Sequence, residues 1–242
     1  MPIERITGIV TDIVRHNDRH NIVSLFTRSR GRVSFLSPAS SGKTGRARNA
    51  RLQLLSVVES DVNFRENREL QTLGSISLGR IWRDIYFNPV KGAIVMFLSE
   101  FLNRYLREAA PEPLLWDYVY LSLANLDSRK GGCANFHLSF LIGFLHFAGI
   151  TPDITGIEKG DYFDMQAGLA VAERPLHKNF LYPSETVFLP LMLRMNMDND
   201  QHFRFKNGER REILRKILQY YSIHFPGLTN LKSPEILGEV FS

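Results

Sequence analysis

The first part of the chain alternates short β-branched runs with polar turns. Residues 6–14 and 21–27 are rich in Ile and Val, and a polar turn at 16–20 separates them. This pattern predicts the two strands of a hairpin. Three further strands are predicted at 32–36, 52–59 and 68–77. Five short strands joined by turns suit a small barrel of the OB type, which closes on itself to hide its edges.

A polar connection between residues 37 and 50 interrupts these strands. It consists mostly of Ser, Gly, Ala and basic residues, and it has no aliphatic side chain larger than Ala. This composition predicts a flexible loop.

Helical periodicity replaces the strand pattern after residue 77. Between residues 89 and 109, the apolar side chains fall on one face of a helix. These side chains are Ala93, Ile94, Phe97, Leu98, Phe101, Leu102 and Tyr105. Further helices are predicted at 114–126, at 135–148, from Ser184 toward Met195 with a kink at Pro190, at 209–223, and from Ser233-Pro234 onward.

The complete pattern indicates an α+β chain with two domains. An OB-fold, nucleic-acid-binding domain is predicted over residues 1–77 and an α-helical domain over residues 78–242. The helical domain includes a short hairpin insertion around 153–182, with its turn at Ala167-Gly168.

Basic residues are concentrated in one segment of the predicted barrel. Residues 19–58 contain no Asp or Glu and eight bases, which leaves 22 basic and 25 acidic residues for the rest of the chain. Such segregation favours a polyanionic partner, although a solvated cationic face is the alternative. The candidate nucleic-acid contacts are Arg19, Arg28, Arg30, Arg32, Lys43, Arg46, Arg48 and Arg51. The aromatic residues of this segment, Phe26 and Phe35, are expected to face the core, so phosphate contacts should dominate.

The candidate chemical motifs do not indicate an enzyme. Ser40-Ser41-Gly42-Lys43-Thr44 resembles the end of a P-loop, but the required first glycine is replaced by Ser37, and a flexible loop is expected to follow. No Gly-x-Ser-x-Gly or active-cysteine signature is present. A single cysteine, Cys133, and scattered histidines do not supply a zinc site. We therefore expect no catalytic residue, no metal and no cofactor.

The apolar runs are far shorter than a membrane span, and the first residues lack the apolar stretch of a secretory signal. We therefore expect no membrane association and a cytoplasmic location.

Several motifs resemble, in the same order along the chain, the bacterial RecO family of recombinational DNA repair mediators. They are Gly8-Ile9-Val10, residues 23–33, residues 52–59, residues 67–71, residues 134–138 with 149–152, residues 220–227 and residues 231–237. The resemblance implies an OB domain followed by a helical domain. It also implies binding of single- and double-stranded DNA, annealing of complementary strands, a nucleoid-associated location, and partnership with RecR and with SSB, the single-strand-binding protein. In that family such contacts help load the recombinase, and no nucleotide is hydrolysed.

Two departures from the family pattern are visible. Many relatives have a four-cysteine zinc ribbon after the position of Pro152, whereas residues 151–182 contain no cysteine here. We therefore expect a hairpin without metal. The basic loop is also rich in Ser and Gly, so the family's DNA contacts carry over only as a region.

The family resemblance further implies that the helical domain captures the acidic and apolar C-terminal tail of SSB. Such a tail requires an apolar groove rimmed by bases. The candidate helix carries Lys91, Phe97, Phe101, Arg104 and Arg107. The alternative is an ordinary amphipathic helix with solvated bases.

Three other functions remain open at this point. An RNA- or ribosome-associated OB protein would be distinguished by competition between RNA and single-stranded DNA. A structural adaptor would not explain the acid-free basic segment. An ATP-using enzyme would retain nucleotide in equilibrium dialysis.

Overall fold

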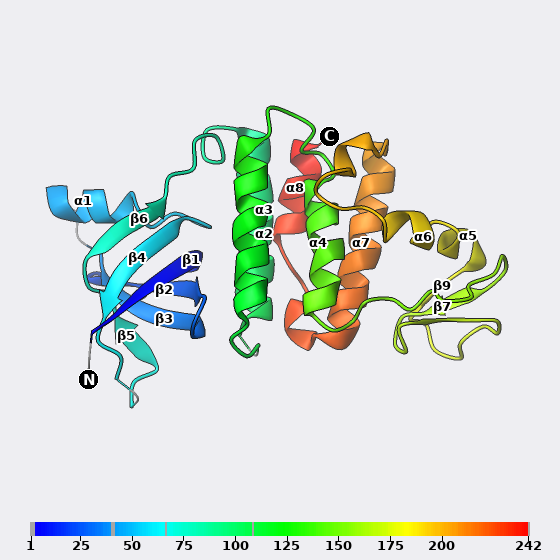
Figure 1. Cartoon of the computed structure of the whole chain (residues 1–242), viewed down its shortest axis with the longest axis horizontal. Helices are drawn as coiled ribbons and strands as arrows, with labels where there is room; N and C mark the ends of the chain where they lie inside the picture. Colours follow the sequence, from blue (N-terminus) through cyan, green and yellow to red (C-terminus); the bar gives the residue numbers. More distant parts are fainter. Residues whose placement is uncertain (1–2, 40–41, 66, 108, 242) are drawn as a thin grey trace. The chain divides into compact units, whose positions relative to one another are not determined.

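The computed structural model describes residues 3–39, 42–65, 67–107 and 109–241 (Figure 1). The chain packs into two compact units, which we call unit 1 and unit 2. Unit 1 comprises Met1–Lys130 with Leu231–Val240, and unit 2 comprises Gly131–Asn230 with Phe241–Ser242. Unit 1 therefore combines the predicted barrel with three helices, while the domain boundary near residue 78 stays a prediction.

Within the described residues of unit 1, six strands form one curled sheet in the order β5-β3-β2-β1-β4-β6. Neighbouring strands are antiparallel, except that β3 and β5 are parallel. This is the OB-type sheet that the sequence predicts. It is a half-barrel that stays open between β5 and β6, so the expectation of full closure is wrong. The strands are β1 (Glu4–Arg15), β2 (His20–Thr27), β3 (Gly31–Pro38), β4 (Val57–Val62), β5 (Leu70–Thr72) and β6 (Ile76–Arg80).

The inner face of the curled sheet holds an apolar core. Ile6, Val10, Leu25 and Phe35 belong to this core and are at most 2% exposed. The prediction that Phe35 faces the barrel core is confirmed. Phe26 is also fully buried, but it follows inward-facing Leu25 on β2 and lies on the other face of the sheet, so its predicted place in the barrel core is wrong. Full burial of a side chain such as Phe35 contributes about 1.5–3 kcal/mol to stability.

Residues 68–77 form two strands rather than the single strand predicted. The chain turns at Gly74, where an added Cβ would lie only 2.3 Å from the carbonyl oxygen of Asp61. Only glycine permits this close approach to the end of β4, so β5 and β6 separate at this point. Residues 52–56 form turns before β4, which corrects the predicted strand at 52–59.

A helix, α1 (Lys43–Asn49), occupies the connection that was predicted to be flexible. Hydrogen bonds hold it and the turn that follows. Arg48 donates to Ser37 Oγ at 3.2 Å and to the Leu73 carbonyl at 3.2 Å, and Arg51 donates to the Ile76 carbonyl at 2.7 Å. The prediction of a flexible loop is wrong because these long-range contacts override the local composition. Ser40 and Ser41 of the P-loop-like motif lie outside the described residues.

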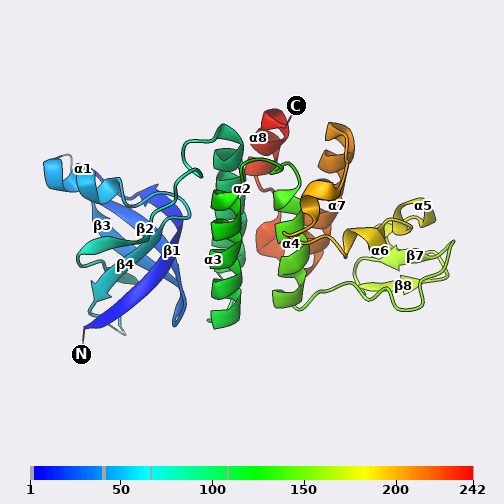
Figure 2. The same cartoon turned by 45° about the horizontal axis from the view of Figure 1, so that its top comes forward.

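Helices α2 (Pro89–Tyr105), α3 (Pro113–Ser128) and α8 (Ser233–Val240) complete unit 1, close to where the sequence predicts helices. The Asn88 side chain caps α2 by accepting from the backbone N–H groups of Val90 and Lys91. Figures 1 and 2 show α1 at the end of the sheet opposite to the start of β1. Within the described residues, no helix has the length and apolarity needed to cross a membrane.

Unit 2 contains the predicted hairpin and the remaining helices. Strand β7 (Tyr162–Asp164) pairs with β8 (Leu169–Val171), and Gly168 turns the chain with a φ of 73°. The hairpin prediction is therefore confirmed. The other elements are β9 (Phe180–Leu181), α4 (Phe136–Phe147), α5 (Pro183–Thr186), α6 (Leu189–Met192), η1 (Asp200–His202), α7 (Asn207–His224) and η2 (Pro226–Leu228).

The helix predicted from Ser184 toward Met195 is instead two short helices, α5 and α6. Pro190 has no N–H group with which to continue the hydrogen-bond ladder from the preceding turn. The chain consequently interrupts the helix between Thr186 and Leu189.

Within unit 1, a carboxylate of α2 binds the start of α8. Glu100 on α2 accepts hydrogen bonds from the Lys232 N–H at 3.0 Å, the Ser233 N–H at 2.8 Å and the Ser233 hydroxyl at 2.6 Å. Burial alone would raise the pKa of Glu100, but these hydrogen bonds and nearby Arg104 lower it. The first backbone N–H groups of a helix favour such an anion.

We predict that Glu100→Gln lowers the free energy of unfolding by about 1–2 kcal/mol at pH 7, because charge-assisted hydrogen bonds to α8 are lost. Urea unfolding followed by the fluorescence of Trp82 and Trp116, both in unit 1, measures this effect. Because the folded-state pKa is lowered, the stabilisation exists above the ordinary glutamate pKa of about 4.3. It disappears as the pH falls through the folded-state value.

Glu239→Gln, an exposed change on α8, is the matched control and should leave stability unchanged. Equal effects of the two substitutions would contradict the role given to Glu100.

Candidate nucleic-acid interface

The basic residues of segment 19–58 lie at two separate ends of the strands rather than on one surface. The β2–β3 register pairs His20 with Pro38 at one end and Thr27 with Gly31 at the other. Seven residue steps along β3, at about 3.3 Å each, separate these ends by roughly 23 Å. Arg28, Arg30 and Arg32 lie at the Gly31 end, and Arg19 lies at the Pro38 end. The concentration of bases along the sequence therefore does not place these four arginines on one continuous surface.

Two of the predicted contacts are paired with carboxylates. Arg28 forms a two-point ion pair with Asp117 on α3, at 2.9 Å for each bond, and Arg30 donates from Nε and Nη2 to Glu4 Oε2 at 2.9 and 2.6 Å. The hydrogen bond and charge of each partner raise the pKa of Arg28 and lower the pKa of Asp117. Exposed pairs of this kind contribute only about 0–1 kcal/mol each. A phosphate can therefore replace either carboxylate at little cost.

Three other predicted contacts are engaged with neutral groups. Arg32 donates to Asn103 Oδ1 at 3.0 Å and to Ser24 Oγ at 2.8 Å. Arg48 and Arg51 hold α1 as described above. Burial lowers the pKa of Arg32 and of Arg48, yet an arginine remains charged at neutral pH. The structure therefore gives these three guanidinium groups a structural role in the free protein.

Arg19, Lys43 and Arg46 complete the predicted set. Arg19 is exposed, and its side chain makes no hydrogen bond or ion pair with any described residue. The side chains of Lys43 and Arg46 lie outside the described part of the chain. Their contacts with nucleic acid stay predictions.

An open cleft lies at the Gly31 end of the sheet, between β3 and the connection that joins β4 to β5. Its volume is about 630 Å³, and we call it the β3–β5 cleft. The cleft is lined by Arg30, Arg32, Val33, Ser34, Phe64, Arg68, Glu69, Leu70 and Gln71. OB-folds bind oligonucleotides on this part of the sheet and on the loops beside it. Two of the predicted bases, Arg30 and Arg32, meet here.

Residues outside the acid-free segment supply the rest of the cleft. The guanidinium carbon of Arg30 lies 4.0 Å from the centre of the Phe64 ring. Arg65 and Arg68 are exposed, and no described residue pairs with either guanidinium group. Arg65 and Arg68 both line a neighbouring hollow of about 450 Å³. The candidate interface therefore includes the β4–β5 connection.

A buried glutamine fixes this connection. The side chain of Gln71 accepts a hydrogen bond from the Arg65 N–H at 2.9 Å and donates to the Arg65 carbonyl at 2.9 Å. Both ends of the amide are thus satisfied by the loop backbone, which holds Phe64 and Arg65 in place.

The sequence prediction missed Phe64, Arg65 and Arg68 because the nearby acids Glu66 and Glu69 hide the local positive charge. An aromatic residue beside two bases, in the connection between two predicted strands, is the signal that identifies this position in an OB-type barrel.

The chain matches known proteins along nearly its entire length. The family model described as recombination protein O N terminal matches residues 1–81, and recombination protein O C terminal matches residues 87–235. The chain belongs to the recombination protein O (RecO) family. This assignment agrees with the resemblance and the OB-type fold inferred from the sequence.

Similar proteins from three organisms carry the name DNA repair protein RecO. The Phocaeicola vulgatus relative is 35% identical over 240 residues, covering 99% of this chain and 100% of that protein. A Bacteroides fragilis relative is 34% identical, with 99% of each chain covered. A Porphyromonas gingivalis relative is 34% identical over 238 residues, covering 97% of each chain.

The residues predicted to bind a RecO partner through α2 are largely inaccessible. Lys91, Phe97 and Phe101 are at most 1% exposed. The Lys91 ammonium lies 2.7 Å from Asp84 and donates to the carbonyls of Asp127 and Arg129. This burial corrects the expectation of an open groove on α2. The roles of Arg104 and Arg107 stay predictions.

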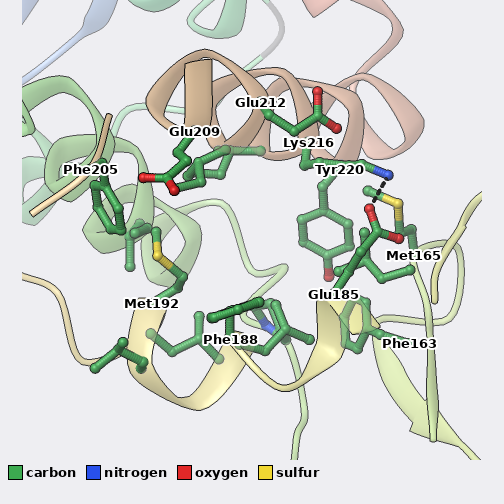
Figure 3. Close-up of a pocket in the computed structure, with 18 of the residues that line it drawn as sticks. Phe163, Met165, Glu185, Phe188, Met192, Phe205, Glu209, Glu212, Lys216 and Tyr220 are labelled. Atoms are coloured by element: carbon green, nitrogen blue, oxygen red, sulfur yellow. Dashed lines mark ion pairs between the residues drawn. The ribbon is translucent and has the colours of Figure 1, made fainter. Parts of the chain in front are cut away.

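Unit 2 contains an apolar groove of about 560 Å³ between α7 and the helices α5 and α6, with α4 at its base (Figure 3). Its lining includes Ile213, Ile217 and Phe188, and Phe188 is 60% exposed. Lys216 on α7 and Glu185 on α5 form an ion pair of 2.7 Å, drawn as a dashed line in Figure 3. We call this feature the unit 2 groove.

A metal site is not visible in the described parts of the chain, where no three His, Cys, Asp or Glu side chains gather as potential ligands. In the hairpin, His177 lies 3.1 Å from Asp164. The absence of zinc stays a prediction.

We predict that Arg48→Gln lowers the free energy of unfolding by about 1 kcal/mol, because its partners Ser37 and Leu73 lose hydrogen bonds. Arg19→Gln should leave stability within about 0.5 kcal/mol, because its side chain is exposed. Urea unfolding followed by tryptophan fluorescence compares the two variants. If the Arg48→Gln variant is as stable as the wild-type protein, this guanidinium group does not hold α1 in place.

Proposed function

We propose that this RecO-family chain is a non-catalytic, DNA-binding recombination mediator. It binds single- and double-stranded DNA, anneals complementary strands, and acts with RecR on SSB-coated single strands to help load the recombinase. The observation that carries the DNA-binding step is the β3–β5 cleft, which combines arginines and an aromatic ring on an OB-type sheet. The relatives named DNA repair protein RecO favour DNA over the RNA-binding alternative.

The cleft suits a single strand because it offers both kinds of contact that such a strand uses. Cations neutralise phosphates and release their counterions. An aromatic ring stacks with an unpaired base regardless of its identity. Annealing follows from the same charges, since a protein that binds two polyanions lowers the repulsion between them.

The test is strand annealing with complementary oligonucleotides coated by SSB, with and without RecR. We expect the wild-type protein to anneal them, and we expect the Arg65→Gln/Arg68→Gln variant to bind DNA several-fold more weakly. For single strands, the plot of log affinity against log salt concentration should also become less steep by about 1.4, because two phosphate contacts are lost. Fluorescence anisotropy of a labelled oligonucleotide measures the affinity and the slope.

Lys159→Gln/Lys178→Gln removes the same charge from exposed positions in unit 2 and is the control. Equal losses in the two double variants would remove the cleft from the mechanism. Failure of the wild-type protein to bind any DNA would refute the proposed function.

The SSB tail is proposed to enter the unit 2 groove rather than the buried face of α2. An acidic and apolar tail needs apolar contacts and a cation. The groove supplies the first, and Lys216 supplies the second when a carboxylate of the tail replaces Glu185. Glu209 and Glu212 also line the groove, and Glu212, one helical turn from Lys216, is paired with Arg215.

We expect Lys216→Gln to weaken binding of a labelled SSB tail peptide several-fold, and Glu185→Gln to strengthen it by releasing Lys216. Anisotropy titration measures both, with Lys178→Gln as the charge-matched control. Unchanged affinity in all three variants would exclude the groove as the tail site.

A further inference from the structure

Arg30 covers a ring whose position is fixed by the core. Phe64 contacts the fully buried Phe35 edge-to-face, with ring centres 6.3 Å apart and an interplanar angle of 61°. On another side, the Arg30 guanidinium lies 4.0 Å from the Phe64 ring centre. Contact with the barrel core therefore fixes the position of the Phe64 ring. The ring is covered by Arg30, whose side chain is long and flexible.

A carboxylate holds Arg30 over this ring. Glu4, at the start of β1, accepts two hydrogen bonds from Arg30. The hydroxyl of Ser29, which precedes Arg30 in the chain, donates to the other carboxylate oxygen of Glu4 at 3.5 Å. The Arg30 side chain is still 47% exposed and that of Glu4 is 34% exposed. Solvent, and therefore a phosphate, can reach the pair.

Two of the groups that Arg30 contacts, Glu4 and Phe64, correspond to the two parts of a nucleotide. A phosphate offers the same paired oxygens as the Glu4 carboxylate. An unpaired base offers the same flat contact to Phe64 as the guanidinium. The free protein therefore fills both positions with its own groups.

We propose, on the basis of the DNA-binding function above, that Phe64 is a base-stacking subsite for single-stranded nucleic acid and that the Glu4–Arg30 pair is its cap. On binding, a phosphate takes the place of Glu4 on Arg30, and an unpaired base takes the place of Arg30 on Phe64. Paired bases in a duplex do not offer a free face, so the exchange favours single strands over duplex.

Release of the cap is tested with Glu4→Gln, by anisotropy titration of a labelled oligo(dT) and of a duplex of equal length. The affinity for the single strand should rise by about 1.5-fold to fivefold, the range expected for removal of one exposed ion pair. The affinity for the duplex should rise less. In a Phe64→Leu background, Glu4→Gln should raise both affinities equally, because the stacking subsite is gone.

Glu59→Gln is a matched control for charge. Glu59 pairs with Arg5 at 2.6 Å, so its substitution also removes one negative charge and also releases one arginine, away from the cleft. Phe64→Tyr keeps the ring and should keep the preference for single strands, which separates loss of stacking from misfolding of Phe64→Leu.

The outcomes distinguish this inference from the function on which it rests. If wild type binds DNA but Glu4→Gln and Glu59→Gln change both affinities alike, the cap is refuted and the proposed function stands. A wild-type protein that binds no DNA refutes both.

Discussion

The arrangement of unit 1 depends on how each guanidinium group satisfies its five N–H donors. Arg48 and Arg51 donate to backbone carbonyls and thereby hold a helix that its own sequence does not favour. Arg28 joins the β2–β3 turn to α3 through Asp117. Other arginines are exposed. Arg30 forms only a weak, solvent-exposed ion pair, and Arg65 and Arg68 form no ion pair with any described residue. The same chemical group therefore stabilises the fold and supplies the proposed binding surface.

This division explains why positive charge in sequence differs from positive charge in space. Residues 19–58 contain no acid, yet Glu4 and Asp117 reach two of their arginines from β1 and α3. Conversely, Arg65 and Arg68 lie among acids in the sequence but have exposed guanidinium groups. The net charge of a sequence segment therefore shows neither the pairing of these arginines with distant acids nor the exposure of Arg65 and Arg68.

The two proposed binding sites share one physical feature. In each, a cation that would meet an anionic partner is occupied by a carboxylate of the chain: Glu4 on Arg30 in unit 1, and Glu185 on Lys216 in unit 2. Solvent reaches both pairs, so each costs little to exchange. This keeps the cations placed for binding without leaving them unsatisfied in the free protein.

Local sequence determined the strands β1 to β3, the long helices and the hairpin turn at Gly168, because period, capping residues and glycine act over a few neighbours. The order of the family motifs also determined the RecO assignment. Tertiary structure alone decided the helix α1, the division at Gly74 and the burial of Lys91, since each depends on atoms far away in the chain. It alone placed Phe64 under Arg30, because the contact joins two loops that only the curled sheet brings together.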